Sequence, residues 1–375
     1  MLKDLFTPCL ILDRGKLDNN IRKIKSIVSK QKIDFRPHLK TAKCLEITKI
    51  LVKEFGPRAM VSTIEELEQL KSSGINDFLY SVAIVPNKLE RIARNLSNNC
   101  KITVSVDNIS TAQELVTFYK STGNRITAVI ELDLDGHRSG VRPYANEQLI
   151  KISKCLDEFD LFRGVMSHAG ESYGLSNEED INNCAKNEAN QTLMAAETIQ
   201  KVGINCELVT IGSTPTALSG SKNIGITELR AGVFIFFDLV QSGVGVCELN
   251  EIAISVLTTV ISINIEIDAI IVDSGWMALS RDRGTSSQEI DYGYGQVCNE
   301  HGELIEDLIV TNVQQEHGII QVREGSDATL PNLKPGDLLR ILPNHACATA
   351  AGHSRYHVVN REDKSIKIWD RFSGW

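Results

Sequence analysis

Short apolar runs alternate with amphipathic segments through the first two thirds of the chain. The amphipathic segments, such as 64–70 and 185–202, repeat apolar residues at a helical spacing, and Thr63 with Glu66 has the pattern of a capping box. The apolar runs have the length of buried strands. The predicted strands cover residues 33–38, 58–62, 77–82, 101–107, 125–133, 161–168, 206–212 and 229–236.

Eight strands with helices between them predict an α/β fold in which a parallel sheet closes into a (β/α)8 TIM barrel. We assign this barrel to residues 14–245. An open, doubly wound sheet is the alternative. It is disfavoured because no GxGxxG turn follows the first strand.

The pattern changes after residue 245, where apolar runs are short and separated by turn signals such as Pro335-Gly336-Asp337. This spacing predicts a β-rich C-terminal domain over residues 246–375. Residues 8–13 also look like a strand, and we assign residues 1–13 to the same β domain. Its predicted strands cover residues 252–266, 269–273, 308–313, 318–323 and 337–342.

Composition narrows the class of protein. The chain has 375 residues, 42% of them apolar, and a net charge of −8, which favours neither a nucleic acid nor an anionic membrane as partner. No apolar run is long enough to span a bilayer, and the first residues lack the apolar stretch of a signal peptide. Nine cysteines without a CxxC pair are typical of reduced thiols. We therefore expect a cytoplasmic protein with a small-molecule substrate.

Lys40 is the leading candidate for chemistry. It follows the first predicted barrel strand together with His38, and catalytic residues of barrels gather at the carboxyl ends of the strands. A lysine amine there can form a Schiff base with a carbonyl cofactor. The alternative is a solvated lysine at the start of a helix.

Other predicted strands also end in polar residues. Arg138 lies in a glycine-rich loop, where it could hold a ring nitrogen unprotonated or simply face solvent. His168 and Tyr173 could stack on a planar cofactor or donate to it, or be ordinary residues of the barrel rim. The turn Gly212-Ser213-Thr214 could bind phosphate, and the same letters would also cap a helix that begins at Pro215.

His345 and Cys347 form a second candidate site in the β domain. On a strand, residues two apart face the same side, and an imidazole with a thiolate suits zinc. Two protein ligands leave coordination positions for water or substrate, as in a catalytic metal site. His353 and His357 could be further ligands or loop residues.

Together these residues resemble the D-serine dehydratase-like and D-threonine aldolase family of pyridoxal-phosphate (PLP) enzymes, which have the alanine racemase fold type. The segments that carry the resemblance are Thr7-Pro8, Arg36-Pro37-His38-Leu39-Lys40-Thr41, His137-Arg138-Ser139-Gly140, His168 with Gly170 and Tyr173, Gly212-Ser213-Thr214-Pro215-Thr216, Glu228-Leu229-Arg230-Ala231-Gly232, Val272-Asp273-Ser274-Gly275 and Pro343-Asn344-His345-Ala346-Cys347.

The resemblance implies a role for each candidate residue. Lys40 carries PLP as a Schiff base, Arg138 lies near the ring nitrogen, and Ser213 and Thr214 bind the phosphate. The residues that complete the implied cofactor site are His38, His168, Tyr173 and Gly212. His345 and Cys347 bind a divalent metal, zinc being favoured over manganese, and the metal helps to bind the 3-hydroxyl of the substrate.

The resemblance also implies the reaction. The expected substrate is a D-3-hydroxy amino acid of the D-serine or D-threonine type, and dehydration is favoured because Cys347 stands where aldolases more usually have aspartate. The alternatives are D-threonine aldolase activity and, in a different reaction class, amino-acid racemization. A homodimer is expected, because enzymes of this fold type usually form dimers.

Overall fold

The computed structural model describes residues 2–375, and the chain divides into two compact units. The barrel unit contains Lys23–Gly232 with Gly374–Trp375, and the β unit contains the chain up to Arg22 with Val233–Ser373. Helix α1 (Arg14–Gln31) crosses the division. Among the described residues, no helix is long and apolar enough to cross a membrane.

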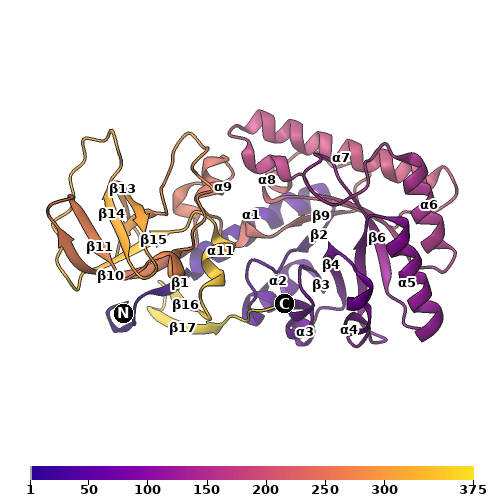
Figure 1. The fold of residues 1–375 in the computed structure, drawn as a ribbon, viewed down its shortest axis with the longest axis horizontal. Coiled ribbons are helices and arrows are strands. Elements are labelled where there is room, and N and C mark those ends of the chain that lie inside the picture. Colours follow the sequence, from indigo (N-terminus) through magenta and orange to yellow (C-terminus); the bar gives the residue numbers. More distant parts are fainter. Residues whose placement is uncertain (1) are drawn as a thin grey trace. The chain divides into compact units, whose positions relative to one another are not determined.

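The barrel unit is a parallel eight-stranded sheet surrounded by helices (Figure 1). The sheet order is β2-β9-β8-β7-β6-β5-β4-β3, and a parallel bridge between His38 and Met60 joins its two edges. The strands are β2 (Asp34–Pro37), β3 (Arg58–Val61), β4 (Asp77–Ala83), β5 (Lys101–Val106), β6 (Thr127–Leu132), β7 (Phe162–Ser167), β8 (Leu208–Ile211) and β9 (Glu228–Ala231). The predicted (β/α)8 barrel is confirmed.

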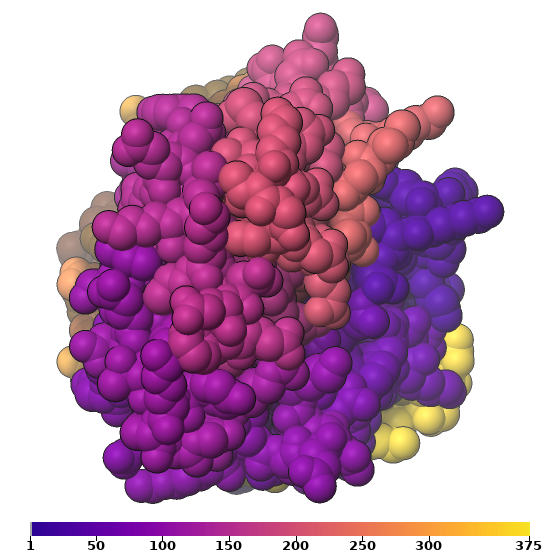
Figure 2. Space-filling view, turned by 90° about the vertical axis from the view of Figure 1, so that its right-hand side faces the viewer, coloured from indigo at the N-terminus to yellow at the C-terminus, as the bar shows by residue number. Residues whose placement is uncertain are grey.

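Helices follow the strands and cover the outside of the sheet. The face seen in Figure 2 is formed mainly by the purple to red segments of this unit. Asparagine and threonine side chains cap several of the helices. Thr63, for example, accepts a hydrogen bond from the backbone of Glu66 at 3.0 Å. The helices are α2 (Leu45–Phe55), α3 (Ile64–Leu70), α4 (Leu89–Ala93), α5 (Ile109–Thr122), α6 (Asn146–Asp157), α7 (Glu178–Gln200) and α8 (Thr214–Leu218).

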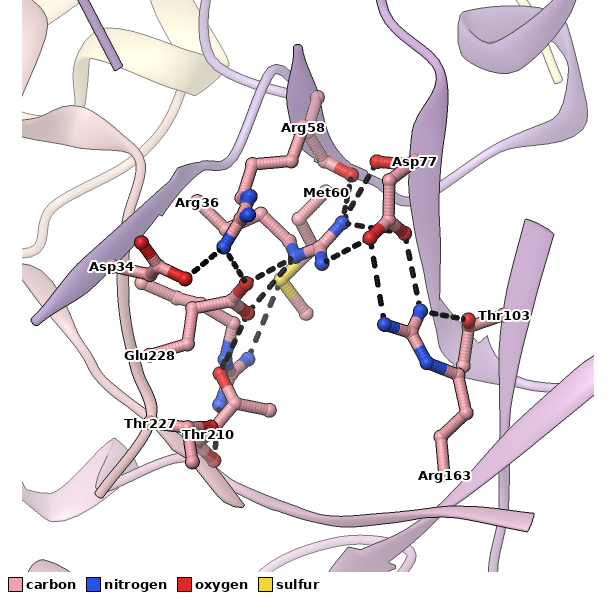
Figure 3. Close-up of polar contacts among 12 residues, drawn as sticks. Asp34, Arg36, Arg58, Met60, Asp77, Thr103, Arg163, Thr210, Thr227 and Glu228 are labelled. Carbon is pink, nitrogen blue, oxygen red and sulfur yellow. Dashed lines mark hydrogen bonds and ion pairs between the residues drawn. The ribbon is translucent and has the colours of Figure 1, made fainter. Parts of the chain in front are cut away.

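Buried charges fill the amino-terminal end of the barrel (Figure 3). Arg36 donates to Glu228 at 2.9 and 3.0 Å and to Asp77 at 3.2 Å, and Asp77 also accepts from Arg163 at 3.2 Å. Burial would lower the pKa of Arg36, but the charges of Glu228 and Asp77 outweigh burial and raise it. The same guanidinium nitrogen of Arg163 also donates to the hydroxyl of Thr103 at 2.8 Å. This network, which we call the barrel plug, lies at the end of the strands opposite the candidate catalytic residues.

The β unit is a nine-stranded sheet in the order β11-β14-β13-β12-β15-β10-β1-β16-β17. Strand β1 pairs antiparallel with β10 and parallel with β16, so it belongs to this sheet. The strands are β1 (Cys9–Asp13), β10 (Ile254–Asn264), β11 (Ala269–Val272), β12 (Gln296–Asn299), β13 (Leu304–Val313), β14 (Gly318–Val322), β15 (Leu338–Leu342), β16 (Arg355–Asn360) and β17 (Ser365–Asp370). Short helices α9 (Leu239–Gly243), α10 (Trp276–Leu279) and α11 (Ala346–Ala351) lie between strands.

Candidate active site

Lys40 lies in the turn between β2 and α2, at the carboxyl end of the strand, and its side chain is exposed. Its backbone N–H reaches Nδ1 of His38 at 3.4 Å, and Nε2 of His38 lies 3.2 Å from Ser62 Oγ and 3.3 Å from Ser81 Oγ. Burial, followed by the positive charges of Lys40 and Arg230, lowers the pKa of His38 well below its usual value. His38 is therefore neutral at physiological pH and adds no positive charge beside Lys40.

His168, Tyr173 and the turn after β8 form one group. Nδ1 of His168 donates to the carbonyl of Gly212 at 2.9 Å, and the rings of His168 and Tyr173 are 6.1 Å apart. The Tyr173 hydroxyl accepts a long hydrogen bond, 3.5 Å, from the backbone N–H of Thr214. Burial, followed by the charge of Arg138, lowers the pKa of His168 to about 3, so this ring is also neutral.

The turn Gly212-Ser213-Thr214 shows the helix-capping alternative directly. Ser213 is the N-cap of α8 and forms a capping box with Thr216. Gly212 has a φ of +141°, and a Cβ there would overlap the carbonyl oxygen of Arg230, so only glycine fits. Thr214 Oγ1 is buried and has no hydrogen-bond partner within residues 2–375. A ligand oxygen at this turn would satisfy that hydroxyl.

Arg138 and Arg230 add positive charge to the group. Arg138 is half exposed and lies 3.4 Å from Glu131 of β6, one oxygen of which is buried without a partner in the described chain. Arg230 of β9 is buried, donates to Thr210 Oγ1 at 2.9 Å and contacts the carbonyl of Ser167. Burial lowers the pKa of Arg230 to about 10, which leaves it charged. A basic side chain and an unsatisfied hydroxyl fit a phosphorylated, anionic cofactor.

His345 and Cys347 are not placed by a strand. Strand β15 ends at Leu342, His345 occupies the N-cap position of α11, and Cys347 lies in the first turn of that helix. His345 contacts both Asp282 and Cys347, and these hydrogen bonds, that with Asp282 first, raise the pKa of His345 to about 11. The interpretation that a strand places this pair was wrong, because Pro343 and Asn344 turn the chain out of β15.

Asp282 fixes the imidazole of His345. The Nδ1–Oδ2 distance is 2.8 Å, so Nδ1 donates to Asp282, and a metal at Nε2 would displace the proton that the raised pKa places there. Within residues 2–375, no cluster of three or more His, Cys, Asp or Glu side chains is arranged to hold a metal. Nε2 of His353 bonds the carbonyl of Ala278 at 3.0 Å instead. The donors fit an incomplete, catalytic metal site rather than a closed structural one.

Two buried polar side chains hold the His345–Cys347 segment. Asp238 caps α9 through Gln241, and its second oxygen accepts the N–H of Ala346 at 2.9 Å. Asn344 accepts from the hydroxyl of Thr285 at 2.7 Å. Burial raises the pKa of Asp238 to about 6. The backbone between the two candidate ligands is thus fixed by the protein itself.

Sequence reasoning missed Asp282, Asp238, Glu131, Arg230 and the buried Glu188. Arg230 lies in a segment that carries the family resemblance, so its position alone could have suggested a role. Glu131 and Asp238 lie at the ends of predicted strands, which is also a signal for a site. Asp282 and Glu188 lack such a signal, because they contact the site only through the fold.

Two family models match the chain. The alanine racemase N-terminal domain matches residues 12–240, and a serine dehydratase domain matches residues 253–359. D-threo-3-hydroxyaspartate dehydratase of Delftia sp. (strain HT23) is 38% identical, with 100% of this chain and 99% of that protein covered. D-serine dehydratase of Dictyostelium discoideum is 29% identical, with 100% and 98% covered. D-threonine aldolase of Arthrobacter sp is 26% identical, with 97% and 91% covered.

Solved structures are also similar to this chain over nearly its whole length. The Delftia dehydratase has a TM-score of 0.97 at 38% identity, with 100% of this chain and 99% of that chain covered. A variant of that dehydratase is described in a metal-free form. An alanine racemase of Clostridium difficile 630 has a TM-score of 0.69 at 15% identity, with 98% and 99% covered, which shows the shared fold alone.

Proposed function

Because the chain belongs to the PLP-dependent enzymes that join an alanine racemase N-terminal domain to a serine dehydratase domain, we propose that it is a metal-assisted dehydratase of D-3-hydroxy amino acids. The products would be a 2-oxo acid and ammonia. The observation that carries this proposal is the end-to-end similarity to a D-threo-3-hydroxyaspartate dehydratase. Cys347 beside His345 supports dehydration over aldol cleavage.

In the barrel unit we assign PLP to the residues at the carboxyl ends of the strands. Lys40 would hold it through the side-chain amine, and the same amine, once released, would remove the Cα proton. Bound PLP supplies the electron sink for that carbanion. Thr214 would satisfy its buried hydroxyl on the phosphate, while Arg138 and Arg230 would keep the ring environment cationic. Neutral His168 and Tyr173 would line the ring.

In the β unit, His345 and Cys347 would hold a divalent metal, zinc being favoured because both imidazole and thiolate suit it. Such a metal acts as a Lewis acid on a hydroxyl that must leave. Asp282 would keep Nδ1 of His345 protonated, so that Nε2 carries the lone pair. Chelation tests whether a metal is needed for turnover.

The experiment is product analysis with D-threonine, D-serine and D-threo-3-hydroxyaspartate in the presence of PLP, with and without a chelator. Chelator-sensitive 2-oxobutyrate from D-threonine, or oxaloacetate from 3-hydroxyaspartate, is the expected result. If ammonia release is unchanged by full metal removal, the metal has no part in the reaction and His345 and Cys347 have another role.

Aldol cleavage is the second candidate, because an aldolase is also similar to this chain over nearly its whole length. Glycine with acetaldehyde from D-threonine would establish it and would show that Cys347 is a poor guide. Racemization is a third candidate, because alanine racemase shares the fold. It needs a base on each face of Cα and no metal, so formation of the L-enantiomer from a D-amino acid by the chelated enzyme would identify it.

We further propose a cytoplasmic homodimer. The dimer is proposed because enzymes of this fold type usually form dimers. The cytoplasmic location is proposed because the nine cysteines, all within the described residues, are free thiols. Light scattering on the purified protein tests the dimer, and a monomer mass of 41.5 kDa would refute it.

A further inference from the structure

Glu188 is a buried acid on α7 whose side chain contacts the ends of two neighbouring strands. One carboxylate oxygen accepts the N–H of Gly212 at 2.9 Å and the N–H of Ala169 at 3.1 Å. The other accepts the hydroxyl of Thr216 at 2.8 Å. Only 1% of Glu188 is exposed, and burial raises its pKa. Burying a carboxylate costs free energy, so its three donors are needed to hold it there.

These contacts connect the two halves of the candidate cofactor site. Glu188 accepts from Ala169, which follows His168 at the end of β7, and from Gly212 at the end of β8. The carbonyl of Gly212 accepts in turn from Nδ1 of His168 at 2.9 Å. These hydrogen bonds connect the ends of the two strands. Thr216 completes the capping box of Ser213. The turn that presents the unsatisfied hydroxyl of Thr214 is therefore fixed from behind by Glu188.

We infer that Glu188 is a positioning residue for phosphate: it holds the Gly212–Thr216 turn in the shape that accepts the phosphate of the cofactor. This inference rests on the proposed PLP function. Without the carboxylate, two buried N–H groups would lose their acceptor and the turn would move to find others. We expect the effect to fall mainly on the phosphate, because two of the three described contacts of Glu188, those from Gly212 and Thr216, lie on the turn and none lies on Lys40.

The test compares the dissociation constants of PLP and of pyridoxal, which lacks the phosphate, measured by absorbance titration of the apoprotein. The ratio of the pyridoxal dissociation constant to the PLP dissociation constant reports the phosphate contribution alone. In Glu188→Ala we expect this ratio to fall about tenfold or more, and in Glu188→Gln, which keeps one acceptor oxygen, about threefold. If the alanine variant does not fold, the glutamine variant decides.

Thr192→Val is the matched control. Thr192 lies one turn along the same buried face of α7, and its hydroxyl lies 2.8 Å from Ser167 Oγ and 2.7 Å from the backbone carbonyl of Glu188, so its described hydrogen bonds do not involve the turn. We expect this variant to lower the melting temperature and to keep the ratio within about twofold. If Glu188→Ala also keeps the ratio while the protein loses stability, Glu188 is only a structural brace and the inference is wrong. A wild-type ratio near one would instead refute the phosphate site itself.

Discussion

Asp77 in the barrel plug gives a prediction whose magnitude follows from the structure. Its side chain is 17% exposed and contacts both Arg36 and Arg163. Burial would raise the pKa of Asp77, but the charges of Arg36 and Arg163 outweigh it and lower the pKa from 3.8 to about 2. Since each tenfold change in acidity is worth about 1.4 kcal/mol, ionised Asp77 stabilises the folded protein by roughly 2.4 kcal/mol.

The sign of the pH dependence follows from the lowered pKa. The folded state binds the Asp77 proton more weakly than the unfolded state, so the stabilisation is complete above the unfolded value of 3.8 and is lost as pH falls towards about 2. Asp77→Asn should therefore cost roughly 2.4 kcal/mol at pH 7 and only about 1.3 kcal/mol at pH 3. Urea denaturation at both pH values, followed by far-UV circular dichroism, measures both differences.

Asp34→Asn is the control for this prediction. Asp34 also pairs with an arginine, Arg58, at the same end of the barrel, but its side chain is 63% exposed. An exposed pair contributes less than about 1 kcal/mol, so this variant should remain close to wild type. Equal costs for the two variants, or a cost of Asp77→Asn that does not change between pH 7 and pH 3, would show that the plug does not act through the charge of Asp77.

Three further predictions concern the candidate site. Lys40→Ala should abolish the visible absorption band that PLP gives with the wild-type protein, and a retained band would mean that another amine holds the cofactor. His345→Ala should keep that band and lose turnover, and full activity would remove the metal from the mechanism. Asp282→Ala should weaken zinc binding about ten- to a hundredfold, measured in competition with a chelating dye. Asp282→Asn keeps an acceptor for Nδ1 and should retain most of the affinity. Equal affinities in both variants and wild type would refute the role of Asp282.

The sequence determined the barrel because parallel strands are buried on both faces and appear as continuous apolar runs. Each of the eight predicted runs contains or overlaps an observed barrel strand, although the last ends at Ala231 rather than at 236. Strands β12, β16 and β17 were missed. Strand β17 lies at a sheet edge and is largely solvent-exposed, so its residues give no apolar run.

The sequence also placed Lys40, His168 and the Gly212–Thr214 turn at strand ends, because strand order alone fixes which end of the barrel a following residue occupies. Only the tertiary structure identified the residues that hold them. Glu188 reaches Gly212 across 24 positions of chain, and Asp282 reaches His345 across 63. No local pattern links such pairs, because their contacts exist only after helices and loops have packed against the strands that carry the site.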